Sequence, residues 1–223
     1  MKNLIPIKSG RYLPFLTALL FGLHPVHTET ITYMASAMDA IGIVFFLGAF
    51  YLYLQNKIFP SVIISLLAFF TTEIALTLPI LIIFYDWVVG KLSKNRAIIY
   101  SWFGAMAAFY VVVRFAVLNI TTRGPYLADS FYLTMLTMTK VLLQYIWVLI
   151  WPVNLTSNHI ISPGIEAFVY RNYQTATIVA QSIFDLDILL SIAVIIFLIF
   201  IVFISRKKYP IISFSLGWFF ISL

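Results

Sequence analysis

Residues 186–208 read LDILLSIAVIIFLIFIVFISRKK, an apolar run over 186–204 that is followed by three consecutive basic residues at 206–208. A helix needs roughly 20 apolar residues to cross the hydrocarbon core of a bilayer. Lys and Arg residues collect at the cytoplasmic ends of such helices. This stretch therefore predicts a transmembrane helix whose C-terminal end, at residues 206–208, faces the cytoplasm.

The composition of the whole chain points the same way. Of the 223 residues, 62% are hydrophobic and 10% are charged, and the mean hydropathy is +1.01. Globular chains carry about 25% charged residues, so the lipid bilayer must be the solvent for much of this chain. The net charge of +6 then reports topology, and no nucleic-acid partner is expected. The lack of cysteine in the sequence excludes disulfides, thiolate metal sites and cysteine nucleophiles.

Basic clusters separate the apolar runs. The clusters lie at residues 2–11, 57, 91–96 and 206–208, and the runs at 12–23, 40–55, 60–70, 74–89, 97–118, 131–151, 186–204 and 210–223. If every cluster is cytoplasmic, each stretch between two clusters crosses the membrane an even number of times. Residues 60–89 are too long for one upright helix and are expected to form two short helices that meet outside near residues 71–73. The run 131–151 carries several polar residues and is expected to be an interfacial or re-entrant helix.

This pattern predicts an all-α polytopic membrane protein with about seven transmembrane helices and one interfacial or re-entrant helix. Residues 119–185 become a large extracytoplasmic segment. All three histidines and every acidic residue except Asp86 then face outside, so the chemistry is expected on the extracytoplasmic face. The run 210–223 is short and has no polar flank, so the chain is expected to be a fragment.

The densest group of chemically capable residues is LHPVHTE at 23–29, followed by Asp39. Imidazoles and carboxylates at a helix end can bind a divalent metal, with His24, His27 and Glu29 as ligands, or can transfer a proton. Ionisable groups near membrane depth are costly in free energy and tend to be functional. The alternative is that these side chains face lipid headgroups and cap the backbone. On an unbroken helix Glu29 and Asp39 would be about 15 Å apart, so a shared site requires a break between them.

Three more charged residues lie at predicted outer positions. Glu73 follows two threonines at a helix junction, where it either joins the first site or helps to cap a helix. Arg114 lies about one turn from the outer end of the run 97–118, where it either binds a lipid phosphate or extends its charged end to the interface. Arg123, on the outer segment, is a further candidate for substrate binding, with a solvated position as the alternative.

Several motifs carry a resemblance to a known family. The residues LFGLHPVHTET at 20–30, followed by Asp39 and an apolar run that ends in YLY at 51–53, resemble the membrane O-mannosyltransferases with tetratricopeptide repeats and their bacterial relatives. That family belongs to the C-type superfamily of multi-spanning glycosyltransferases. Three further motifs agree in order along the chain: TEIALTLP at 72–79 with Asp86-Trp87, YVVVR at 110–114, and residues 145–155 around Trp151-Pro152.

This resemblance implies a C-type glycosyltransferase-like membrane domain over residues 1–223. It also implies transfer of a mannose-like sugar from a polyprenyl-phosphate carrier to a hydroxyl of a protein or glycan acceptor. The active face would be extracytoplasmic, in the plasma (inner) membrane or the endoplasmic reticulum. The residues implied are His24, His27, Glu29 and Asp39 for catalysis, with Glu73 in support and Arg114 for substrate binding.

Two departures from the family pattern leave alternatives open. Met38 and Thr72 stand where the family usually has basic residues, and the family's acidic first outer loop would lie upstream of residue 1. The chain alone is therefore expected to be inactive.

One alternative function is that of a transporter or flippase-like component, although the chain shows no internal repeat and its acids gather at one face. The other alternative is a degenerate relative without catalytic activity.

Overall fold

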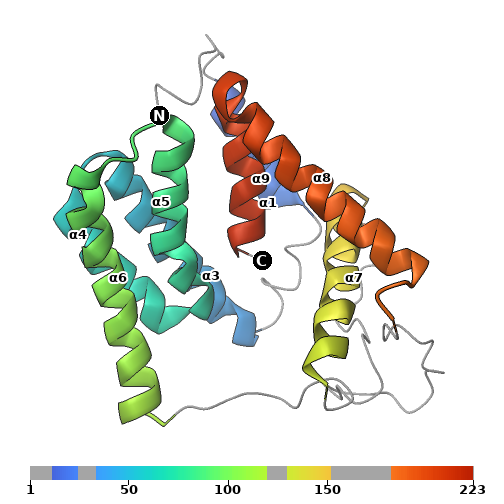
Figure 1. The fold of residues 1–223 in the computed structure, drawn as a ribbon. Coiled ribbons are helices and arrows are strands. Elements are labelled where there is room, and N and C mark those ends of the chain that lie inside the picture. The colour runs from blue at the N-terminus through green and yellow to red at the C-terminus, as the bar shows by residue number, and fades with distance from the viewer. Residues whose placement is uncertain (1–11, 25–33, 120–129, 152–181, 223) are drawn as a thin grey trace. The chain divides into compact units, whose positions relative to one another are not determined.

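The computed structural model describes residues 12–24, 34–119, 130–151 and 182–222 (Figure 1). The chain divides into two compact units: residues 1–121 with 199–223 form unit 1, and residues 122–198 form unit 2. Within the described residues the regular structure is entirely helical, which confirms the all-α prediction.

Each apolar run of the sequence forms a helix. The helices are α1 (Leu13–Leu23), α3 (Met34–Leu54), α4 (Ile58–Thr71), α5 (Leu78–Val89), α6 (Ala97–Val112), α7 (Phe131–Ile150), α8 (Leu186–Lys208) and α9 (Pro210–Ser222). Three short helices adjoin them: the 3₁₀ helices η2 (Glu73–Thr77) and η3 (Lys94–Arg96), and the π-helix η4 (Val113–Val117). The break between α4 and η2 confirms that residues 60–89 form two short helices.

Two helical segments are long and apolar enough to cross a membrane, Lys94–Val117 and Ile188–Lys208. Met38–Leu54, Ile58–Thr71 and Pro210–Ser222 are shorter apolar helices. Large apolar side chains such as Phe200 and Phe203 are about 60% exposed along α8, which favours a lipid environment for this helix. These features indicate a membrane protein, while the number of about seven spans stays a prediction.

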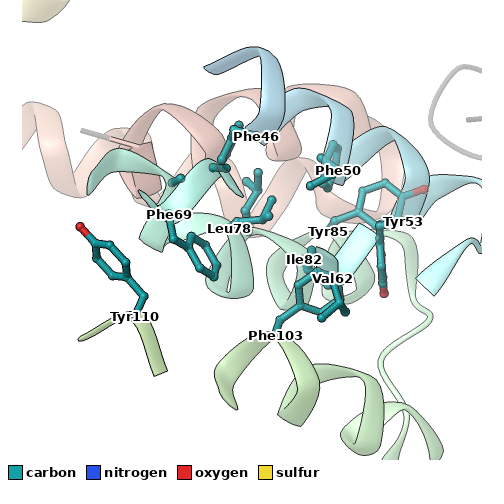
Figure 2. Close-up of a cluster of buried hydrophobic side chains, with 14 of the residues drawn as sticks. Phe46, Phe50, Tyr53, Val62, Phe69, Leu78, Ile82, Tyr85, Phe103 and Tyr110 are labelled. Atoms are coloured by element: carbon teal, nitrogen blue, oxygen red, sulfur yellow. The ribbon is translucent and has the colours of Figure 1, made fainter. Parts of the chain in front are cut away.

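Unit 1 has a core rich in aromatic side chains (Figure 2). α3 and α4 form an antiparallel hairpin, α4 and α5 pack on α6, and α5 also packs on α9. The ring of Phe50 stacks on Phe214 at 5.8 Å between centroids and meets Tyr85 edge-on at 5.6 Å. Small polar residues also join the helices, since the Ser61 hydroxyl donates a hydrogen bond to the Ala49 carbonyl at 2.6 Å.

In unit 2, α7 is one continuous helix. The Ser130 hydroxyl caps its first turn by accepting a hydrogen bond from the Leu133 N–H at 3.4 Å. The hydroxyls of Thr134, Thr137 and Thr139 each donate to the carbonyl four residues earlier. Because these hydroxyls are satisfied inside the helix, they do not require contact with water. The interfacial or re-entrant position of 131–151 stays a prediction.

The basic clusters of unit 1 gather at one end of its helices. Lys57 lies in the α3–α4 turn, and residues 91–96 connect α5 to α6. Arg206, near the end of α8, donates a hydrogen bond to the Trp87 carbonyl at 3.0 Å and lies 4.1 Å from the centroid of the Trp87 ring. Three of the four clusters are therefore at the same end, as a shared cytoplasmic side requires. The first cluster, at residues 2–11, lies outside the described residues.

Candidate functional site

A pocket of about 300 Å³ opens at the other end of unit 1, among the first turns of α3, the junction of α4 with η2, and the last turns of α6 with η4. It is formed by residues that are far apart in the sequence. The lining residues are Asp39, Phe70, Thr71, Thr72, Glu73, Tyr110, Arg114 and Leu118.

Arg114 is the only cation among the described residues that line this pocket. Its side chain is 15% exposed, and its Nη2 atom lies 2.5 Å from Glu73 Oε1. Its Nη1 atom donates a hydrogen bond to the Tyr110 hydroxyl at 2.9 Å. A guanidinium carries five donors in a planar fork that matches carboxylate and phosphate groups. Two of these donors therefore fix the side chain, and others are left for a ligand.

The helix changes its winding where it presents Arg114. After Val112 the chain continues as the π-helix η4, in which the Leu118 N–H donates to the Val113 carbonyl at 3.0 Å. π-turns are rare and occur frequently at functional sites. Because a π-turn is wider than an α-turn, the side chains that follow Val113 point in other directions than they would on a continued α-helix.

Glu73 begins η2 directly after the break that ends α4. Thr72 is extended, with φ −145° and ψ 140°, and its N–H donates to the Ala68 carbonyl at 2.9 Å. The break allows Glu73 to reach Arg114 while its own side chain stays 69% exposed. A carboxylate in the first turn of a helix is also favoured by the helix dipole. The two interpretations of Glu73, helix stabilisation and membership of a site, are therefore compatible.

The margin of the pocket is partly apolar. The side chains of Phe70 and Leu118 are 50% and 54% exposed. The ring of Phe70 meets that of Tyr110 edge-on at 5.2 Å between centroids. Asp39 is exposed near the start of α3. The pocket thus combines one guanidinium, two carboxylates and an apolar margin. It can bind an anionic group at Arg114 and accept a proton at a carboxylate.

The structure brings three of the predicted site residues, Asp39, Glu73 and Arg114, together in this pocket. His24 directly follows α1 and is half-buried, and it is not part of the pocket lining. Three predicted residues lie outside the described residues: His27, Glu29 and Arg123.

The predicted metal site is not tested by this geometry. No group of three His, Asp or Glu side chains suited to a metal ion occurs in the described part of the chain. Two of the three predicted ligands, His27 and Glu29, lie outside that part. The divalent metal therefore stays a prediction.

Sequence reasoning missed the contribution of Tyr110. Its side chain is 7% exposed, and its hydroxyl accepts a hydrogen bond from Arg114. The spacing of four residues on one helix was the available signal, because side chains at positions i and i+4 share a face.

A second polar cluster, also missed, lies at the opposite end of α3, α5 and α6. Asp86 is fully buried, and its Oδ2 atom accepts hydrogen bonds from Tyr53 and Tyr100 hydroxyls, both at 2.6 Å, and from Arg96 at 2.9 Å. Figure 2 shows Tyr53 and Tyr110 at opposite ends of the aromatic core. An acid inside an apolar run needs such partners, so its position in the sequence was a signal for this cluster.

No protein-family model, curated protein or solved structure matches this chain. The activity must therefore be inferred from the pocket and from the sequence motifs.

Proposed function

We propose that this chain belongs to a membrane glycosyltransferase that transfers a mannose-like sugar from a polyprenyl-phosphate carrier to a hydroxyl of a protein or glycan. The observation that carries the proposal is the pocket in which the guanidinium of Arg114 lies beside the carboxylates of Asp39 and Glu73. The motif similarities around residues 20–30, 72–79 and 110–114 supply the reaction class.

The pocket suits both parts of such a donor. A guanidinium binds phosphate oxygens through paired N–H donors. Next to it, the exposed side chains of Phe70, Phe115 and Leu118 offer an apolar surface for the first prenyl units. Because the basic clusters lie at the other end of the unit, the pocket faces the extracytoplasmic side in the proposed topology.

The proposed reaction assigns different roles to the two carboxylates. The acceptor hydroxyl attacks the anomeric carbon of the sugar, its proton moves to a carboxylate, and the bond from that carbon to the phosphate oxygen breaks. Asp39 suits the proton acceptor better than Glu73, because Glu73 is paired with Arg114 and Asp39 has no ion pair within the described residues. Arg114 stabilises the charge on the departing polyprenyl phosphate.

The remaining predicted residues complete this proposal. His24, His27 and Glu29 are proposed to contribute to catalysis or to hold a divalent metal, and Arg123 to bind the substrate. The membrane is proposed to be the plasma (inner) membrane or the endoplasmic reticulum, where lipid-linked sugars serve as donors.

Binding of a radiolabelled, short-chain polyprenyl-phosphate mannose to the purified chain tests the proposal. R114Q is expected to weaken binding by about tenfold to a hundredfold, because it removes charged hydrogen bonds to phosphate. R206Q is the matched control, because it removes a guanidinium at the other end of the unit. Equal affinities of wild type and R114Q, or no saturable binding by the wild type, would contradict the proposal.

A further inference from the structure

The charges in the pocket raise a difficulty for an anionic ligand. Asp39 and Glu73 contribute two negative charges and Arg114 one positive charge, so the described lining has a formal charge of −1. In addition, Arg114 is already paired with Glu73. A phosphate that enters this pocket would meet a neutralised cation and would be repelled by two carboxylates.

We propose that Glu73 is an internal counter-ion, which pairs with Arg114 while the pocket is empty and gives up this place to the phosphate of a lipid ligand. The inference rests on the proposed function, because it takes Arg114 as the phosphate-binding residue. It changes the role of Glu73 from a catalytic group to a group that sets the affinity of the donor site.

The different exposures of the two partners support this exchange. The side chain of Arg114 is 15% exposed, so its charge is more stable beside an anion than without one. The side chain of Glu73 is 69% exposed, so its carboxylate can leave Arg114 and turn into water at little cost in free energy. The ion pair is therefore easier to open from the side of the glutamate than from the side of the arginine.

Tyr110 allows the arginine to stay in place during the exchange. Its side chain is 7% exposed, and its hydroxyl accepts a hydrogen bond from Arg114 Nη1 at 2.9 Å. Glu73 binds the other terminal nitrogen, Nη2. Departure of the carboxylate thus frees Nη2 without releasing Nη1, and a phosphate oxygen can take the place of Glu73 Oε1.

Neutralising Glu73 should therefore improve anion binding. E73Q removes the competing charge, and the expected result is roughly three- to tenfold tighter binding of a lipid phosphate, as for loss of a partly exposed ion pair. D39N is the matched control, because it makes the same charge change in the same pocket without breaking the Arg114 pair. It should tighten binding less than E73Q does.

The experiment measures the affinity of the purified full chain in detergent for farnesyl phosphate. Farnesol and inorganic phosphate are measured in parallel, to separate a lipid phosphate from a lipid tail or a free phosphate. The variants are E73Q, D39N, R114Q and the double variant R114Q/E73Q, each checked for monodispersity and helix content. We expect E73Q to bind farnesyl phosphate more tightly than the wild type, R114Q to bind it weakly, and the double variant to match R114Q.

Several outcomes would overturn the inference. If R114Q loses binding while E73Q binds no better than the wild type, the proposed function survives and Glu73 is not a competitor. If E73Q and D39N tighten binding equally, the effect is general charge repulsion and not ion-pair exchange. If R114Q binds like the wild type, both the inference and the proposed function fail. Equal affinities for inorganic phosphate and farnesyl phosphate would overturn the assignment to a lipid.

Discussion

Arg96 Nη1 lies 2.9 Å from Asp86 Oδ2 and joins the start of α6 to the end of α5, at the end of these helices that is farther from the pocket. The hydroxyls of Tyr53 and Tyr100 donate to the same carboxylate oxygen. Tyr53 follows Asp39 by 14 residues on α3, and Tyr100 precedes Arg114 by 14 residues on α6 and η4. A separation of 14 residues corresponds to about 21 Å along a helix. One polar cluster thus holds the helices whose other ends carry the pocket.

D86A tests the contribution of this cluster to stability. The substitution leaves the Arg96 guanidinium and two tyrosine hydroxyls without their shared acceptor, and we expect a loss of about 3 kcal/mol, as for a broken buried ion pair. Thermal unfolding in detergent measures the effect. K94A, which changes an exposed residue of the same turn, should leave the unfolding temperature nearly unchanged. Equal unfolding temperatures for D86A and the wild type would show that the cluster does not hold the helices.

G42A tests the close approach of α3 to the break that carries Glu73. A Cβ atom at Gly42 would lie 2.5 Å from Thr72 Cγ2, and we expect overpacking to cost about 1–3 kcal/mol. The pocket should also bind farnesyl phosphate less well, because Thr72 lines it.

Gly48 provides the control on the same helix. A Cβ atom there would have its nearest neighbour, Ile64 Cγ2, at 3.9 Å. G48A should therefore be neutral or stabilising by up to about 1 kcal/mol, since alanine favours helix more than glycine does. If G42A were as stable as G48A, the helices would not be as close as the structure has them.

The orientation of the chain can be tested because the sequence contains no native cysteine. Lys94 begins the apolar segment Lys94–Val117, and Asn119 lies just after its end. Both residues are exposed. In intact cells, a membrane-impermeant thiol reagent should label N119C and leave K94C unlabelled, because the proposed topology places the basic end in the cytoplasm. Labelling of K94C with protection of N119C would reverse the proposed topology.

The helices could be predicted from the sequence because hydrophobic runs and charged turns determine them locally. Even the break at Thr72 followed from length, since residues 60–89 exceed the thickness of a bilayer as one helix. Pro79 at the start of α5 supports this break.

The pairings could not be predicted in the same way. Arg114 lies on a π-helix that no pattern of residues predicted, and its partner Glu73 belongs to a different helix. The choice of Arg96 as partner of Asp86, over the nearby Lys91 and Lys94, depends on the geometry of the α5–α6 turn. Tertiary packing decides such contacts, and the pattern of apolar residues does not encode them.

Photocrosslinking shows whether this pocket holds a lipid-linked sugar donor at Arg114. The probe is a short-chain polyprenyl-phosphate mannose with a diazirine in its first prenyl unit, and mass spectrometry locates the crosslinked peptides. Crosslinks are expected within residues 70–73 and 110–118, the two segments that supply most of the pocket lining, and they should be lost in R114Q but not in R206Q. Crosslinks confined to the end that carries Asp86 and Arg96, or crosslinks that R114Q leaves unchanged, would contradict binding of the donor at Arg114.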